Sequence, residues 1–159
     1  MCGIIAAASE RNVGKLLVKG LHKMEYRGYD SAGIALHQKD KIAHLRTLGK
    51  VKLLEEKMIS EKPKSKLGIA HTRWATHGEP SEENAHPHKS NERVYIVHNG
   101  IIENYIELKK FLKEQGYNFS SQTDSELIAH MIEYFLGEGN NMLDSMYLTK
   151  KKLDGAYAI

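Results

Sequence analysis

The sequence predicts an α+β fold, and three observations favour it over a regularly alternating α/β fold. Two short apolar runs flank a polar turn and form a predicted hairpin, other strand-length apolar runs stand apart from it, and three predicted helices follow one another. The sequence shows no internal repeat, domain boundary or low-complexity segment. Its length of 159 residues therefore predicts about one domain.

The N-terminal part of the chain predicts strands and helices in turn. The continuous apolar run 4–8 is typical of a buried strand, and apolar residues at helical spacing predict a helix over 12–25. A polar loop follows. Residues 32–36 and 41–46 then form the predicted hairpin, and 51–59 a second helix.

A long polar stretch lies in the middle of the chain. After the solvated connector 61–66 and the apolar residues 67–70, residues 71–91 have the composition of a loop. Loops of this length are uncommon in a compact domain unless they build a functional site. The stretch is therefore a candidate site, and the apolar run 94–97 after it predicts a strand.

Three helical patterns follow, over 101–112, 127–135 and, more weakly, 142–153. Residues 155–159 predict the beginning of a strand, and the chain stops inside it. We therefore expect the domain to be incomplete at its C-terminus, with an exposed sheet edge.

Composition and charge are those of an ordinary globular protein. The chain has 23 Lys and Arg against 20 Asp and Glu, a net charge of +3, and 41% hydrophobic residues. This charge is too small to predict binding to nucleic acid or to an anionic membrane. The single cysteine, Cys2, excludes an intramolecular disulfide and fits a reducing cytosol. No signal peptide and no apolar stretch of roughly 20 residues is present, so a cytoplasmic location is expected.

Cys2 is the strongest candidate for chemistry. Removal of Met1 would leave a thiol and a free α-amino group on the same residue, which supplies a nucleophile together with a base. An α-amine with an ordinary pKa of about 7.7 to 8.0 accepts a proton near neutrality. The alternative is that Cys2 is a small buried hydrophobic residue at the start of a strand.

Two further positions have both a functional and a structural interpretation. Asn99 and Gly100, directly after a predicted strand, could offer a side-chain amide and a backbone N–H to an oxyanion. Asn-Gly is also a common hairpin turn. The Arg73 guanidinium has the geometry to bind a carboxylate, and Asp124 could bind an ammonium group; alternatively, Arg73 is a surface cation and Asp124 a helix-terminal acid.

The sequence predicts no metal and no organic cofactor. Four histidines, His71, His77, His86 and His88, lie close together and raise the possibility of a zinc site with Cys2. Their spacing matches no common ligand pattern, and no second cysteine is present. Neither of the common glycine-rich phosphate-binding motifs occurs.

Five segments carry a resemblance to a known family. They are CGI at 2–4, EYRGYDSAG at 25–33, HTRWATHGEPSEENAHPH at 71–88, HNGIIEN at 98–104 and SQTDSE at 121–126. Together they resemble the glutaminase domain of class II glutamine amidotransferases, from residue 2 to the end of the chain. The forms at 25–33 and 71–88 resemble most closely the sugar-phosphate branch of that class.

The resemblance implies a fold and an activity. The fold would be the four-layer αββα sandwich of N-terminal-nucleophile hydrolases, lacking its C-terminal part here. Cys2 would attack the side-chain amide of L-glutamine, with its own α-amine as base, to form a glutamyl thioester and ammonia. Water would then hydrolyse the thioester, and no cofactor would be needed.

The resemblance also implies roles for individual residues. Asn99 and the Gly100 N–H would stabilise the oxyanion, Arg73 would bind the glutamine α-carboxylate, and Asp124 its α-ammonium group. Further residues would line the pocket or support it; they are Trp74, Thr76 and His77 for the lining, with Trp74 also gating ammonia, and Arg27, Tyr29 and His86 for support.

The family's partners and the alternatives complete the prediction. Besides L-glutamine, the resemblance implies a larger sugar-phosphate isomerase domain, absent from this chain, and a homodimer in the full-length enzyme. A glutaminase domain of another class II enzyme, such as an amidophosphoribosyltransferase or a glutamate synthase, is the first alternative. A non-catalytic glutamine-binding fragment is the second, and a zinc-binding module the third.

Overall fold

The computed structural model describes residues 2–75 and 78–159. Thr76 and His77, two of the predicted pocket residues, lie outside the described residues, as does Met1. The chain divides into two compact units, Met1–Pro87 and His88–Ile159.

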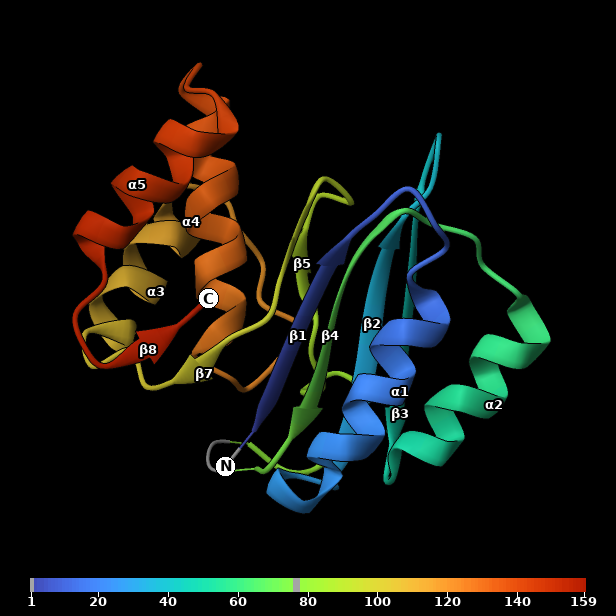
Figure 1. Cartoon of the computed structure of the whole chain (residues 1–159). Coiled ribbons are helices and arrows are strands. Elements are labelled where there is room, and N and C mark those ends of the chain that lie inside the picture. Colours follow the sequence, from blue (N-terminus) through green and yellow to red (C-terminus); the bar gives the residue numbers. More distant parts are fainter. Residues whose placement is uncertain (1, 76–77) are drawn as a thin grey trace. The chain divides into compact units, whose positions relative to one another are not determined.

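The first unit is built on an antiparallel sheet, which has four strands among the described residues (Figure 1). The strands are β1 (Gly3–Ala8), β2 (Ser31–His37), β3 (Ile42–Leu48) and β4 (Leu67–Arg73), and their spatial order is β1-β4-β2-β3. β4 therefore lies inside the sheet and pairs with both β1 and β2.

Two helices pack against this sheet, α1 (Gly14–Met24) and α2 (Val51–Glu61), and a short 3₁₀ turn, η1 (Glu25–Arg27), follows α1. Figure 1 shows α1 and α2 side by side over the same face of the sheet. The core between them is aliphatic and includes Leu17, Leu21, Ile34, Leu36, Leu54 and Ala70. Burial of such side chains is the main force that holds helices on a sheet.

The sheet register brings three segments to one end of the unit. Gly3 of β1 lies opposite Thr72 of β4, and Ser31 of β2 lies opposite Arg73. Since β4 runs antiparallel to both neighbours, its C-terminal end lies beside their N-terminal ends. Cys2, Asp30 and the residue after Arg73 are therefore close together, although they are far apart in the sequence.

The second unit contains two pairs of short strands among its described elements. β5 (His88–Ser90) pairs with β6 (Val94–Ile96), and β7 (Asn99–Gly100) pairs with β8 (Tyr157–Ala158). Both pairs are antiparallel.

Three helices accompany these strands: α3 (Tyr105–Glu114), α4 (Ser125–Gly137) and α5 (Met142–Lys152). α4 contacts α3, α5, β5 and β6, so it is the centre of this unit (Figure 1). Its core includes Ile102, Leu112, Leu127, Ile128 and Met131. No helix in the described part of the chain is long and apolar enough to cross a membrane.

The predicted loop 71–91 is too long at both ends. Residues 71–73 belong to β4 and 88–90 form β5, so the polar connection runs from 74 to 87. The prediction failed because these strand residues are polar but buried: His71 and Thr72 lie in the middle of the sheet, where the ladder supplies the hydrogen bonds of their backbone.

Candidate active site

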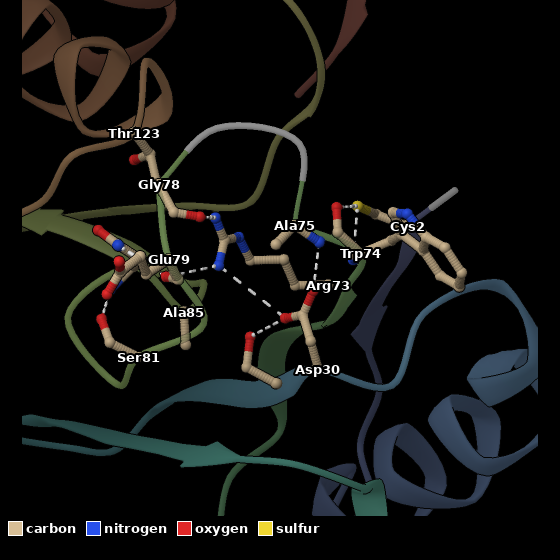
Figure 2. A network of polar contacts seen from close by, with 12 residues as sticks. Cys2, Asp30, Arg73, Trp74, Ala75, Gly78, Glu79, Ser81, Ala85 and Thr123 are labelled. Carbon is tan, nitrogen blue, oxygen red and sulfur yellow. Dashed lines mark hydrogen bonds and ion pairs between the residues drawn. The ribbon is translucent and has the colours of Figure 1, made fainter.

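Cys2 lies immediately before β1 and is half-buried. Its sulfur accepts a hydrogen bond from the Trp74 N–H at 3.2 Å, and the thiol donates to the Trp74 carbonyl at 3.6 Å (Figure 2). Trp74 follows the last residue of β4, so the strand register described above creates this contact. The side chain is therefore held by polar backbone groups and is not the fully buried hydrophobic residue of the alternative interpretation.

Asp30 binds the backbone of the residues on either side of Trp74, namely Arg73 and Ala75. One of its carboxylate oxygens accepts a hydrogen bond from the Ala75 N–H, and the other accepts one from the Ser31 hydroxyl at 3.0 Å (Figure 2). The Asp30 N–H also donates to the Arg73 carbonyl at 3.2 Å. The backbone that contacts the cysteine is thus fixed by a carboxylate that follows the EYRGY segment.

Arg73 is buried, with 4% of its surface exposed, so the interpretation as a surface cation is wrong. Its Nη1 lies 3.9 Å from an Asp30 oxygen and donates to the Glu79 carbonyl at 3.4 Å, and its Nη2 donates to the Gly78 carbonyl at 3.1 Å (Figure 2). The guanidinium therefore attaches the loop after β4 to the end of the sheet. Its binding of a substrate carboxylate remains a prediction.

The EYRGYD segment lies close to the backbone of Arg73 and Trp74. A Cβ on Gly28 would lie 2.7 Å from the Arg73 carbonyl carbon and 2.9 Å from the Trp74 nitrogen, both backbone atoms that have little room to move. Next to it, the half-exposed ring of Tyr29 meets that of Trp74 edge to face, with centroids 5.5 Å apart. Arg27 lies in η1 on the same segment.

His86 lies in the interior of the first unit. Its ring packs against that of His71 with centroids 4.1 Å apart, and both residues are buried. The absence of a side chain at Gly33 leaves space for the His86 carbonyl. The structure therefore places this predicted supporting residue among buried polar groups of the sheet.

Asn99 and Gly100 form β7 in the second unit, opposite Ala158 and Tyr157. Gly100 has φ +132°, while Asn99 has no positive φ. A type I′ hairpin turn needs a positive φ at both central residues, so the hairpin interpretation of this dipeptide is wrong. A Cβ on Gly100 would also collide with the Ala156 carbonyl, which explains why glycine is required there.

Asp124 precedes α4 and is 7% exposed. Its carboxylate makes no capping hydrogen bond to that helix; instead, it accepts one from the Ile102 N–H at 2.9 Å. Its other oxygen lies 3.5 Å from the Ser125 hydroxyl. The carboxylate thus links the start of α4 to the segment that follows Asn99 and Gly100, and it is more than a helix-terminal acid.

His98 is a residue that the sequence analysis missed. Its Nδ1 lies 2.7 Å from the Ser125 hydroxyl. Burial lowers the pKa of His98, and the nearby Asp124 carboxylate opposes this effect only in part. The ring is therefore neutral near pH 7. Its sequence signal was its place as the first letter of the HNGIIEN motif, directly before Asn99.

Residues 2–75 and 78–159 contain no group of three or more His, Cys, Asp or Glu side chains arranged to hold a metal ion.

The chain is similar to proteins of known family. Residues 71–159 match the family described as "Glutamine amidotransferase domain". Over its whole length, the chain is 53% identical to a glutamine–fructose-6-phosphate aminotransferase (isomerizing) of Haemophilus influenzae and 52% identical to that of Acinetobacter baylyi. It spans about a quarter of the length of these curated relatives, namely 26%.

Solved structures resemble it as well. A glutamine phosphoribosylpyrophosphate amidotransferase from B. subtilis, complexed with ADP and GMP, matches with a TM-score of 0.84 and 26% identity, over 99% of this chain and 34% of its own. A structure described as the allosteric regulatory enzyme of purine biosynthesis matches with a TM-score of 0.85 and 27% identity, over the same shares of the two chains. These matches confirm the predicted α+β fold class of N-terminal-nucleophile type.

Proposed function

The chain belongs to the family of glutamine amidotransferase domains, and we propose that it hydrolyses L-glutamine to glutamate and ammonia. The observation that supports this proposal best is the position of Cys2, whose sulfur is held by the Trp74 backbone at the end of the four-stranded sheet. A half-buried thiol with a defined direction is what a nucleophile needs.

The proposed reaction has two steps. The Cys2 sulfur bonds to the side-chain amide carbon of glutamine, the C–N bond breaks, and the nitrogen leaves as ammonia with a proton that the α-amine of Cys2 has taken from the thiol. Water then attacks the glutamyl thioester, releasing glutamate and restoring the thiol. Removal of Met1 is part of the proposal because only a free amine can act as this base.

The other predicted residues receive their roles in the same proposal. Asn99 and the Gly100 N–H stabilise the oxyanion of the tetrahedral intermediate. Arg73 binds the α-carboxylate and Asp124 the α-ammonium group of glutamine. The remaining residues line the pocket, namely Trp74, Thr76 and His77, or support it, namely Arg27, Tyr29 and His86.

We further propose that the ammonia serves the amination of fructose-6-phosphate to glucosamine-6-phosphate, carried out with the rest of a longer protein. This proposal rests on the identity of 53% to a glutamine–fructose-6-phosphate aminotransferase. The partners would be a sugar-phosphate isomerase domain and a second subunit. The structural match to a glutamine phosphoribosylpyrophosphate amidotransferase favours a different acceptor, but at a lower identity of 26%.

Ammonia release from L-glutamine tests the hydrolysis. We expect the full chain to release ammonia, and Cys2→Ala to reduce the rate to background without changing the circular dichroism spectrum. The substitution should leave the fold intact because Cys2 lies outside the strands and is half-buried, so its side chain is not part of the aliphatic core. Hydrolysis that persists in Cys2→Ala would contradict the mechanism.

A further inference from the structure

Glu126, in the first turn of α4, is a buried carboxylate that the proposed reaction does not use; it is 3% exposed. It accepts four hydrogen bonds from two consecutive residues. Its Oε1 binds the Ser120 N–H at 2.9 Å and hydroxyl at 2.8 Å, and its Oε2 binds the Ser121 N–H and hydroxyl, both at 2.7 Å. The carboxylate thus fixes the backbone and the side chains of the loop before Asp124.

His130, one helical turn further along α4, lies next to the Glu126 carboxylate. Its Nε2 lies 3.5 Å from Glu126 Oε1, and its Nδ1 lies 2.8 Å from the Ser90 hydroxyl. The rings of Tyr117 and Phe119 pack against it. Serine, histidine and carboxylate follow one another as in a hydrolase triad, but Ser90 is 1% exposed and no substrate could reach it.

The charge of Glu126 is maintained despite its burial. Burial by itself raises the pKa of the carboxyl group. The interactions with His130, the N–H groups of Ser120 and Ser121 and the Ser121 hydroxyl outweigh that effect, so the pKa lies well below its ordinary value of 4.5. The loop is therefore bound by a carboxylate ion at neutral pH, and charged hydrogen bonds of this kind are among the stronger ones.

Hydrogen bonds extend from this anchor to Thr123, the residue before Asp124. The Ser121 hydroxyl lies 3.0 Å from the Thr123 hydroxyl, which lies 3.0 Å from His88 Nε2. Asp124 comes next, and its carboxylate is aligned by the Ile102 N–H. The segment 120–123 is thus held at its start by the Glu126 carboxylate, and it continues at its other end, through Asp124, into α4.

We propose that Glu126 is a positioning residue for glutamine recognition: by holding Ser120 and Ser121 it sets the orientation in which the Asp124 carboxylate meets the α-ammonium group. This inference rests on the proposed function, since it takes from it the pairing of Asp124 with that ammonium group. It adds a residue that contacts neither the substrate nor the nucleophile and that determines which amides are accepted.

A purely structural role predicts something different. If Glu126 only stabilised the fold, its loss would weaken the binding of every ligand by the same factor. As a positioning residue, its loss weakens only the ligand that carries an ammonium group. Glutaramate, which is glutamine without the α-amino group, provides this comparison because it keeps the amide and the carboxylate.

The experiment measures how well each ligand protects Cys2 from alkylation by iodoacetamide, a readout that requires no turnover. For Glu126→Gln, we expect the Kd of glutamine to rise about tenfold and that of glutaramate to stay within about twofold, as the loss of one aligned charged contact predicts. On an Asp124→Asn background, Glu126→Gln should cause no further loss, because the two residues act through one interaction.

Glu133→Gln is the matched control. Glu133 is also buried on α4, but its carboxylate binds Arg93 at 3.0 Å and Asn91 at 3.4 Å, on a different segment from residues 120–123. We expect it to leave the ratio of the two Kd values unchanged. If Glu126→Gln does not fold, Ser121→Ala, which removes one hydroxyl from Oε2, should shift the ratio in the same direction by about threefold.

Different outcomes overturn different claims. An equal loss for both ligands, or an unchanged ratio in the folded Glu126→Gln protein, overturns the positioning role while leaving the proposed hydrolysis intact. A wild-type chain that binds both ligands equally overturns the inference together with the role of Asp124. A selective loss of glutamine protection in Glu126→Gln, in a chain whose wild type releases no ammonia, would contradict the proposed hydrolysis and still support the inference.

Discussion

The two units hold their candidate residues in different ways. In the first unit, Cys2 is positioned by backbone groups, because the register of β1 and β4 brings the Trp74 N–H and carbonyl to its sulfur. In the second, the Asp124 carboxylate accepts a hydrogen bond from the Ile102 N–H, and the loop before it is held by the buried carboxylate of Glu126. The position of Cys2 should therefore be sensitive to steric changes in the backbone, and that of Asp124 also to the loss of the Glu126 charge.

Gly28→Ala should break the first arrangement most severely. The added Cβ meets the backbone of Arg73 and Trp74 at 2.7 to 2.9 Å, and crowding of this kind costs about 1–3 kcal/mol. Because the displaced atoms hold the sulfur of Cys2, we expect ammonia release to fall by about 100-fold. Gly137→Ala, at a position where a Cβ meets nothing within 4 Å, is the control and should stay within about twofold. Comparable activity in the two variants would contradict the account.

Asp30→Asn should weaken the same unit through a single polar group. The amide keeps the size of the carboxylate but loses its charge beside Arg73 and one acceptor position, so the turn that contains Ala75 is held less firmly. We expect kcat/KM for glutamine to fall about tenfold. Asp40→Asn, in the exposed turn between β2 and β3, should have no effect. An equal loss in both variants would show that net charge, rather than this contact, is responsible.

The second unit should respond to acid. The pKa of Glu126 is lowered in the folded protein, so its contribution to stability is complete above about pH 4.5, its ordinary value, and decreases as the pH falls below it. We expect the difference in urea midpoint between wild type and Glu126→Gln to be constant from pH 6 to pH 5 and to shrink toward pH 3. A difference that stays constant down to pH 3 would contradict this assignment.

Tyr29→Leu should have the smallest effect. The edge-to-face contact with Trp74 is half-exposed, and such pairs contribute about 0.5–1.5 kcal/mol. We expect the KM for glutamine to rise about threefold with little change in kcat. Tyr29→Phe, which keeps the ring, should behave as wild type; a loss as large as that of Tyr29→Leu would assign the effect to the hydroxyl.

Apolar patterns predicted much of this architecture. The strands near 4–8 and 32–36 and the helices near 51–59 and 127–135 are confirmed, because each has enough apolar residues at the right period. The apolar pattern did not predict the strand residues that are polar, at 71–73 and 88–90, or the two-residue strand β7. Pairing with distant strands, rather than local propensity, makes these residues extended.

The candidate site shows the same division. The fold class and the family predicted from the motifs are confirmed, whereas the roles of Cys2, Arg73, Asn99 and Asp124 stay predictions. Glu126 was visible only as the last letter of a motif. Its importance depends on four hydrogen bonds to a loop five and six residues earlier, which no periodicity reveals.

The most direct test of the central claim is the intact mass of the protein after incubation with a glutamine analogue that alkylates catalytic thiols. The account predicts a species without Met1 that gains one adduct, located on Cys2, and L-glutamine should suppress its formation. Absence of the adduct, or an adduct that forms equally well in excess L-glutamine, would contradict the claim that Cys2 is the nucleophile of a glutamine site.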